Sequence, residues 1–330
     1  MAKARKILAR RKAVKSIHTV TRTMEMVATA QFKRTFNRCL SARGYIDGVS
    51  ELTEEVIAKT LPKDLRHPLL REKKPSAPRV LLILTSDRGL CGGYNSAILS
   101  RARLRRDELV QAGKTVPLHV IGKAGLSELK YAGETIEKHH KELDPIGAGG
   151  WHRVTRLADG FMNEFLGGQI SGLDVAYSTL IGAARHEPTI QTILPMRMKT
   201  KEELEQEEQA ARRDRAQKSD DRWREWEPLE PFEPFEVFVP LPEKQHEYEF
   251  VPSPAVLYQR LLPMTLRLRL FQCFLEASVT EQIARMTAMR AASDSAEDMI
   301  RSLTVQYNRT RQGQITTELA EILGGRMALQ

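Results

Sequence analysis

Residues 14–32 read VKSIHTVTRTMEMVATAQF, and their apolar side chains recur at steps of three or four positions. The predicted seam consists of Val14, Ile17, Val20, Met24, Val27 and Gln31–Phe32. Such spacing is typical of the narrow stripe that a coiled coil buries. No proline occurs between Ile7 and Leu61, and Pro62 ends the run. One helix of this length is on the order of 80 Å long, more than a domain of this size can cover.

The other end of the chain has the same character. After Pro263 no proline follows, and Gly313 is the only glycine before Gly324 and Gly325. This predicts a second helix on the order of 90 Å long. Its predicted seam consists of Leu268, Phe271, Leu275, Ile283, Met286, Met289, Ala292, Ala296, Met299, Leu303 and Tyr307. Two long, narrow-striped helices at opposite ends of one chain most simply pair with each other as an antiparallel coiled coil.

The middle of the chain follows a different pattern. Residues 80–84, VLLIL, form a short apolar run that ends in the turn-rich sequence SDRGLCGG at residues 86–93, so we expect a buried strand followed by a loop. We further expect helices at 96–111 and 154–165, and strands at 116–121, 174–180 and 190–194. Alternation of strands and helices predicts a mostly parallel sheet covered by helices, a Rossmann-like α/β domain.

These patterns divide the chain into five regions. We predict an N-terminal coiled-coil helix at 1–62, the Rossmann-like domain at 76–198, a charged insertion at 199–235, a linker at 236–254 and a C-terminal coiled-coil helix at 255–330. Residues 201–227 are densely charged with few apolar anchors, and prolines punctuate the residues that follow, which favours a solvated helix leading into an extended linker.

Charge is unevenly distributed along the 330 residues. The net charge of the chain is +9, yet residues 1–45 alone hold twelve basic side chains against one acidic side chain, whereas residues 200–250 hold eight basic and sixteen acidic ones. No apolar run approaches the roughly 18 residues of a membrane span, and the basic N-terminus does not resemble a secretory signal. Three scattered cysteines argue against a disulfide framework. We therefore expect a cytosolic protein.

A few motifs could carry chemistry. The loop Gly89-Leu90-Cys91-Gly92-Gly93 could cradle a phosphate, but its spacing fits neither nucleotide fingerprint, and a structural turn is the favoured interpretation. Cys91 could be reactive if Arg88 lowered its pKa, yet no partner histidine can be identified. His139 and His140 lie near two glutamates but lack a second cluster, so a solvated, charged surface is favoured over a metal site. The sequence predicts a noncatalytic protein without a cofactor.

The basic first helix leaves three interpretations open. Clustered lysine and arginine can bind nucleic acid, as a coiled-coil nucleic-acid-binding or scaffold protein would, although no aromatic residue precedes Phe32 among the charges. The same charges could match an acidic protein collar. They could also simply solvate a long helix. A Rossmann-like enzyme using the Gly89–Gly93 loop is a further alternative.

Four strings in order along the chain resemble the gamma subunit of F-type ATP synthases. They are TRTMEMVATA at 21–30, SDRGLCGGYN at 86–95, EQIARMTAM at 281–289 and YNRTRQGQITTELAEI at 307–322. The resemblance spans nearly the whole chain except about residues 199–235. It implies a noncatalytic rotating central stalk that couples transmembrane ion flow to ATP synthesis or hydrolysis, with catalysis in the beta subunit.

The resemblance also implies partners and contact residues. The shaft would enter the hexamer of alpha and beta subunits, and the α/β domain would lie near epsilon (and delta) and the membrane c-ring, with no nucleic acid expected. Met24, Arg311, Gln312 and Thr316 match beta-subunit contact positions, and Glu247 and Tyr248 match a segment near the c-ring. The motif loop comprises Asp87, Arg88, Gly89, Leu90, Cys91, Gly92 and Gly93. In a bacterium, the protein would be peripheral to the cytoplasmic face of the inner membrane.

The charged insertion departs from the pattern of most relatives. It lies where chloroplast members of the family carry a redox-regulatory insert, but it contains no cysteine, so thiol switching is not implied. We expect this arm to brake or steer rotation through contacts with the stator ring. Deleting it should then change the rate of ATP hydrolysis or its inhibition.

Overall fold

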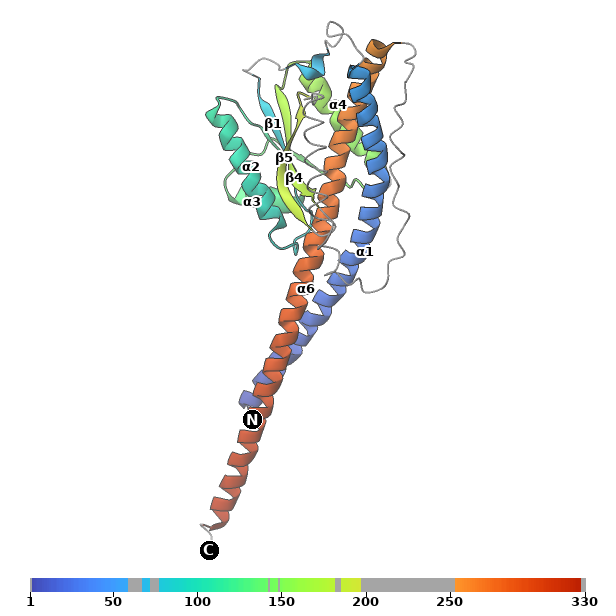
Figure 1. Cartoon of the computed structure of the whole chain (residues 1–330). Helices are drawn as coiled ribbons and strands as arrows, with labels where there is room; N and C mark the ends of the chain where they lie inside the picture. The colour runs from blue at the N-terminus through green and yellow to red at the C-terminus, as the bar shows by residue number, and fades with distance from the viewer. Residues whose placement is uncertain are drawn as a thin grey trace, which may run out of the picture.

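The computed structural model describes residues 2–58, 67–71, 77–141, 143–147, 149–181, 185–196 and 253–327. The described residues between 67 and 196 form the body of the molecule, a sheet covered by helices, and two long helices project from it as a shaft (Figure 1). The predicted insertion and residues 236–252 of the predicted linker lie outside the described residues. No helix in the described ranges has a stretch long and apolar enough to cross a bilayer.

The shaft consists of the two ends of the chain, as predicted. Helix α1 spans Ala2–Ala58 and helix α6 spans Pro254–Met327, and they lie side by side in opposite directions (Figure 1). The second helix begins before Pro263, which lies inside it, and it continues through Gly313. Proline removes only one helical hydrogen bond, and the surrounding packing of Leu262 and Leu266 in the core outweighs that loss.

The buried seam of α1 differs from the predicted one. Val14 is buried as expected, but the side chains of Ile17, Val20, Met24 and Val27 are 39–56% exposed. Together with the half-buried positions 11, 18, 21, 32, 39, 42 and 49, the buried positions follow an alternation of three and four residues that begins at Ile7. They are Ile7, Val14, Glu25, Ala28, Thr35, Ile46, Thr53 and Val56. Each misassigned residue from 17 to 27 immediately precedes a seam position and therefore lies about 100° around the helix from it.

The side of α6 that faces α1 explains which positions of α1 are buried. Its seam passes through the small residues Ser293 and Ala296 to Leu303, whereas the predicted Met299 is 44% exposed. Small side chains let two helices approach closely, so the seam accepts the small or polar residues of α1. The hydroxyl oxygens of Thr53 and Thr265 lie 3.1 Å apart, and the Arg11 guanidinium lies 5.5 Å from the centroid of the Tyr307 ring. The same number of residues separates the two pairs on α1 and on α6, so the two helices keep one register between them.

The body contains one five-stranded sheet. The strands are β1 (Arg79–Leu84), β2 (Leu118–Ile121), β3 (Lys138–His140), β4 (Gly172–Leu180) and β5 (His186–Leu194), in the spatial order β3-β2-β1-β4-β5. All neighbouring pairs are parallel except β4 and β5, which are antiparallel. The predicted Rossmann-like α/β domain is therefore confirmed. The strand order reverses at β1, whose carboxyl end is thus a switch point of the sheet.

Four further helices belong to the body. They are the short 3-10 helix η1 (Pro68–Leu70), α2 (Tyr94–Gln111), α3 (Lys123–Tyr131) and α4 (Gly150–Leu166). Sequence patterns missed α3, which has nine residues, and β3, which has three polar residues. Such short elements carry too few apolar positions to establish a period.

The core lies on both faces of the sheet. One face packs Leu82 and Val175 against Phe161 of α4 and against Leu266 and Leu270 of α6. The other face packs against α2, through Leu81, Ile83, Ile98 and Leu99. Burying each of these aliphatic side chains contributes about 1.5–3 kcal/mol. The first part of α6 is therefore part of the core of the body, while the remainder forms the shaft.

A buried charge cluster joins three strands and α2. The Asp174 carboxylate, which is fully buried, accepts hydrogen bonds from Nε of Arg79 at 3.0 Å and Nε of Arg105 at 2.9 Å. Nη2 of Arg79 donates a third at 2.5 Å, and the hydroxyl of Thr192 donates a fourth at 2.8 Å. Burial alone would raise the pKa of Asp174, but the hydrogen bond and charge of Arg79 outweigh it and hold this pKa below its usual value.

Two histidines form a second polar cluster, between the sheet and α4. Nε2 of His140 lies 3.2 Å from Nδ1 of His119, and both rings contact Phe161, His119 in a tilted and His140 in an edge-on arrangement. The prediction of a solvated surface around His139 and His140 is therefore wrong for His140, because its pairing in β3 places it beside β2. Burial lowers the pKa of both paired rings to about 4, helped for His119 by the charge of His140 and for His140 by that of Lys138.

This histidine pair predicts a loss of stability in mild acid. Their pKa values in the folded protein lie below the ordinary value near 6.5, so between about pH 6.5 and 4 the unfolded chain binds more protons. Stability is thus full above this window and is lost as the pH falls through it, by up to about 1.4 kcal/mol per pH unit for each proton. The free energy of unfolding of His140→Gln, measured in urea, should depend less on pH between pH 7 and 5 than that of the parent chain. An unchanged dependence would contradict the assignment.

Candidate partner-binding surface at the junction of body and shaft

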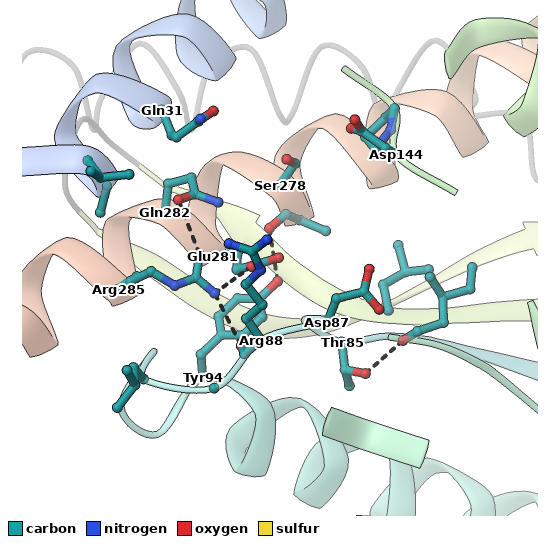
Figure 2. Close-up of a pocket in the computed structure, with 18 of the residues that line it drawn as sticks. Gln31, Thr85, Asp87, Arg88, Tyr94, Asp144, Ser278, Glu281, Gln282 and Arg285 are labelled. Carbon is teal, nitrogen blue, oxygen red and sulfur yellow. Dashed lines mark hydrogen bonds and ion pairs between the residues drawn. The ribbon is translucent and has the colours of Figure 1, made fainter. Parts of the chain in front are cut away.

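A cavity of about 680 Å³ opens where α1, α6 and the loop after β1 meet. Its walls include the apolar side chains of Met24 and Val27 of α1. They also include charged side chains, Arg88 of the loop and Glu281 and Arg285 of α6 among them (Figure 2). The switch point of the sheet faces the shaft here.

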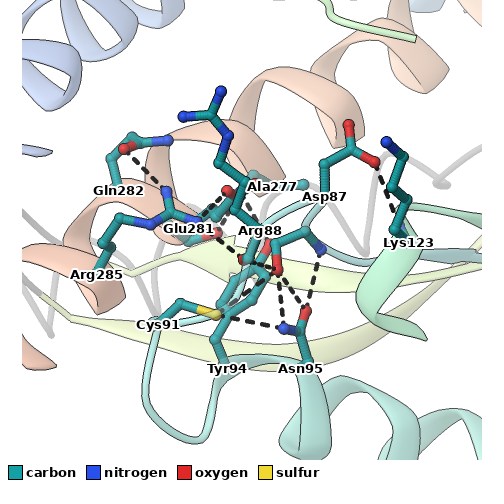
Figure 3. A network of polar contacts seen from close by, with 12 residues as sticks. Asp87, Arg88, Cys91, Tyr94, Asn95, Lys123, Ala277, Glu281, Gln282 and Arg285 are labelled. Atoms are coloured by element: carbon teal, nitrogen blue, oxygen red, sulfur yellow. Dashed lines mark hydrogen bonds and ion pairs between the residues drawn. The ribbon is translucent and has the colours of Figure 1, made fainter. Parts of the chain in front are cut away.

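The loop between β1 and α2 is built by internal hydrogen bonds. The Asn95 side chain accepts a bond from the Ser86 amide at 3.0 Å and donates one to Sγ of Cys91 at 3.3 Å (Figure 3). The backbone turns at Leu90 and Gly92, which have φ values of 65° and 58°. Leu90 is the only residue other than glycine with a positive φ in the described part of the chain. The loop is thus a packed turn, in line with the favoured interpretation of the sequence.

The loop is held to α6 by one arginine. Nη2 of Arg285 donates to the Arg88 carbonyl oxygen at 3.2 Å and to the Glu281 carboxylate at 2.7 Å (Figure 3). Burial raises the pKa of Glu281, although the hydrogen bond and charge of Arg285 oppose that rise. Because Arg285 binds a backbone atom of the loop, the loop backbone cannot move away from α6 without breaking this contact.

A second contact holds the loop to the body. Oδ1 of Asp87 accepts a hydrogen bond from the amide of Lys123, the first residue of α3, at 3.2 Å. An acidic group at a helix N-terminus is stabilised by the unpaired amides and the helix dipole. Immediately behind it, the Thr85 hydroxyl donates to the Ile121 carbonyl at 2.7 Å and accepts from the Gly125 amide at 3.1 Å. The two charged residues at the tip, Asp87 and Arg88, are therefore presented by a fixed loop.

The chemistry of this junction suits binding. Cys91 is buried, with its sulfur directed at Ser86 and Asn95, so the thiol is enclosed by the loop. Among the described residues, no group of three or more His, Cys, Asp and Glu side chains could hold a metal ion. Paired charges beside exposed apolar side chains are typical of a protein interface.

An exposed apolar stripe on α1 extends from this junction along the shaft. It consists of Ile17, Val20, Met24 and Val27, of which Met24 and Val27 also line the cavity. The spacing of these residues predicts that they belong to the coiled-coil seam, but the structure leaves them exposed. The alternation that begins at Ile7 and Val14 could have revealed that a second stripe runs beside the seam.

The other predicted contact residues lie elsewhere. Arg311, Gln312 and Thr316 are exposed on the last part of α6, at the free end of the shaft, and the Thr316 hydroxyl donates to the Gln312 carbonyl at 3.0 Å. Since Met24 lies at the junction, the structure places these residues in two separate regions of the shaft. Glu247 and Tyr248 fall outside the described residues.

Comparisons with known proteins assign the chain to one family. A family model described as ATP synthase matches residues 3–329. The ATP synthase gamma chain of Rhodopirellula baltica is 35% identical over 330 residues, and that of Gemmatimonas aurantiaca is 32% identical over 334, each covering 100% of both chains. A chain in the cryo-EM structure of the Euglena gracilis mitochondrial ATP synthase (OSCP/F1/c-ring, rotational state 3) has a similar fold. Its TM-score is 0.59 at 17% identity, covering 99% of this chain and 95% of that one.

Proposed function

Because the chain belongs to the family of ATP synthase gamma chains, and is thus the noncatalytic central-stalk subunit, we propose how it engages its neighbours. The shaft enters the hexamer of alpha and beta subunits, and the body remains outside, towards the membrane. The observation that carries the proposal is the shaft itself, which projects far beyond the body and exposes different side chains around its circumference. An asymmetric axle in a ring of three equivalent catalytic subunits contacts each one differently, so each is stabilised in a different conformation.

We assign the beta-subunit contacts to two levels of the shaft. Met24, within the exposed stripe on α1, contacts beta at the junction. Arg311, Gln312 and Thr316 contact it near the free end of α6. Support comes from their exposure and from the apolar character of the stripe, because a contiguous exposed apolar surface usually marks an interaction site. The basic side chains within residues 1–45 match an acidic collar around the shaft.

At the opposite end, we place epsilon, delta and the c-ring. Glu247 and Tyr248 belong to the segment assigned to the c-ring on the resemblance alone. The protein would then be peripheral to the membrane, on the cytoplasmic face of the inner membrane in a bacterium. The insertion at 199–235 would brake or steer rotation through the stator ring. Its composition, rich in both charges, is consistent with a polar contact.

Reconstitution with purified alpha and beta subunits tests the proposed function. We expect ATPase activity that depends on this chain, because the asymmetric shaft is needed to drive the catalytic subunits through their conformations in turn. A chain with Arg311, Gln312 and Thr316 replaced by alanine should lose several-fold of that activity. Replacing the exposed pair Glu297 and Arg301 is the matched control, since it alters charged residues on the same helix.

Two results would contradict the proposal. One is equal turnover of the hexamer with and without the chain. The other is salt-sensitive retention of the chain on DNA with no affinity for alpha and beta, which would favour the nucleic-acid alternative.

A further inference from the structure

Side-chain hydrogen bonds join helix α6 to the body from Arg267 to Arg285, and three of them meet in one short segment, residues 276–280. The Tyr94 hydroxyl, from the first residue of α2, donates to the Ala277 carbonyl oxygen at 2.9 Å. The Thr179 hydroxyl, near the end of β4, donates to Oε2 of Glu276 at 2.7 Å. The Thr280 hydroxyl lies 3.1 Å from the carbonyl oxygen of Ser178, a residue of β4. Thus α2 and β4 both bond the same turn of the helix.

The contacts of Tyr94 and Thr280 are withdrawn from water, whereas the bond between Thr179 and Glu276 is half-buried. Tyr94 is 4% exposed, Ser178 1% and Thr280 0%, and Figure 3 shows Tyr94 beneath α6 and directed at Ala277. Burial raises the pKa of Tyr94 far above its ordinary value, so the phenol stays protonated and remains a donor. A buried hydroxyl or carbonyl that loses its partner has no solvent to replace it.

Directional bonds have a mechanical effect that apolar packing lacks. Dispersion and hydrophobic contacts between a helix and a sheet are nondirectional, so a helix can roll or slide while keeping most of them. A hydrogen bond to one particular carbonyl or carboxylate weakens steeply once its distance and angle leave the favourable range. A roll of α6 against the sheet would therefore break the bonds of Tyr94 and Thr179 together.

We propose that Tyr94 and Thr179 are positioning residues that lock α6 to the body, so that torque passes between body and shaft without slippage. The inference rests on the function of the chain as a rotor subunit. The lock occupies the part of α6 that lies against β4, before the helix leaves the body as the shaft. It acts on transmission of rotation and leaves the catalytic contacts of the shaft intact.

The test is an assembled ATP synthase in sealed liposomes that carries Tyr94→Phe and Thr179→Val. ATP hydrolysis is measured twice, against the ion gradient that the enzyme itself builds and with an ionophore that dissipates this gradient. Each missing hydrogen bond raises the population of slipped states by about fivefold. We expect normal hydrolysis with the ionophore, a lower steady gradient, and loss of the several-fold acceleration that the ionophore causes in the parent enzyme.

Two controls separate the lock from a general loss of folding. Thr179→Ser, used in place of Thr179→Val, keeps the hydroxyl and should restore coupling. Tyr258→Phe removes a buried phenol oxygen of α6 that has no hydrogen-bond partner among the described residues, and it should leave coupling unchanged. A double variant that sustains the full gradient would overturn the proposal. Loss of chain-dependent hydrolysis in the parent enzyme itself would instead contradict the proposed function.

Discussion

Asp174→Asn is expected to lower the free energy of unfolding by about 3–5 kcal/mol, one of the largest effects of any single substitution in this chain. The amide keeps the shape of the carboxylate but removes its charge. Arg79 is itself buried, so its guanidinium would then lie in the core of the sheet without an anionic partner. Urea unfolding followed by circular dichroism at neutral pH measures the loss.

Glu108→Gln is the matched control for that experiment. It removes a carboxylate that pairs with Arg105 at 2.9 Å but is largely exposed, and it should cost less than about 1 kcal/mol. The pH dependence supplies a second check. The depressed pKa of Asp174 means that its contribution is present above about pH 4 and is lost as the pH falls further. Equal losses for the two variants would contradict the role of the buried cluster.

Gly122→Ala should destabilise the body by at least about 3 kcal/mol, because two independent costs add. Gly122 has a φ of +94°, a conformation that disfavours any side chain with a Cβ atom. The added methyl group would also meet the backbone carbonyl of Thr85 far inside van der Waals contact. Since Thr85 begins the loop that carries Asp87 and Arg88, the substitution should also displace the junction surface.

Gly113→Ala distinguishes these two costs. Gly113 has a φ of +73° but nothing lies within 4 Å of the position of its Cβ, so only the backbone cost of about 1 kcal/mol applies. Thermal unfolding of both variants should show a clearly larger shift for Gly122→Ala. Similar shifts would mean that the Thr85 backbone relaxes away from the new methyl group.

Long elements could be predicted from the sequence because each carries a repeated signal. The two helices of the shaft extend over many turns without a break, and residues 80–84 of β1 are a continuous apolar run that the structure buries completely. The phase of the seam could not be read as easily. Ile17 and Val20 are more hydrophobic than the seam residues Thr21 and Glu25, so hydrophobicity alone points to the wrong side of α1. The small size of the facing residues of α6 decides which side is buried.

The candidate site was only partly predictable, for a related reason. The motif loop stood out because its glycines interrupt a strand-helix unit, and its residues do lie at the junction of body and shaft. The bond from Arg285 to the Arg88 carbonyl joins residues almost two hundred positions apart, and no local pattern signals a side chain that binds a distant backbone atom. The same applies to Tyr94 and Ala277.

The exit of α6 from the body has a mechanical consequence. At Gly92 of the loop, the position of a Cβ atom lies 3.6 Å from Cβ of Ala288 in α6, so two of the smallest residues meet there. Beyond the body, the helix pair stands alone (Figure 1). A beam fixed at one end and loaded sideways experiences its greatest bending moment at the root. Here the loop touches α6, so sideways load on the tip is transferred into the glycine loop and the sheet behind it.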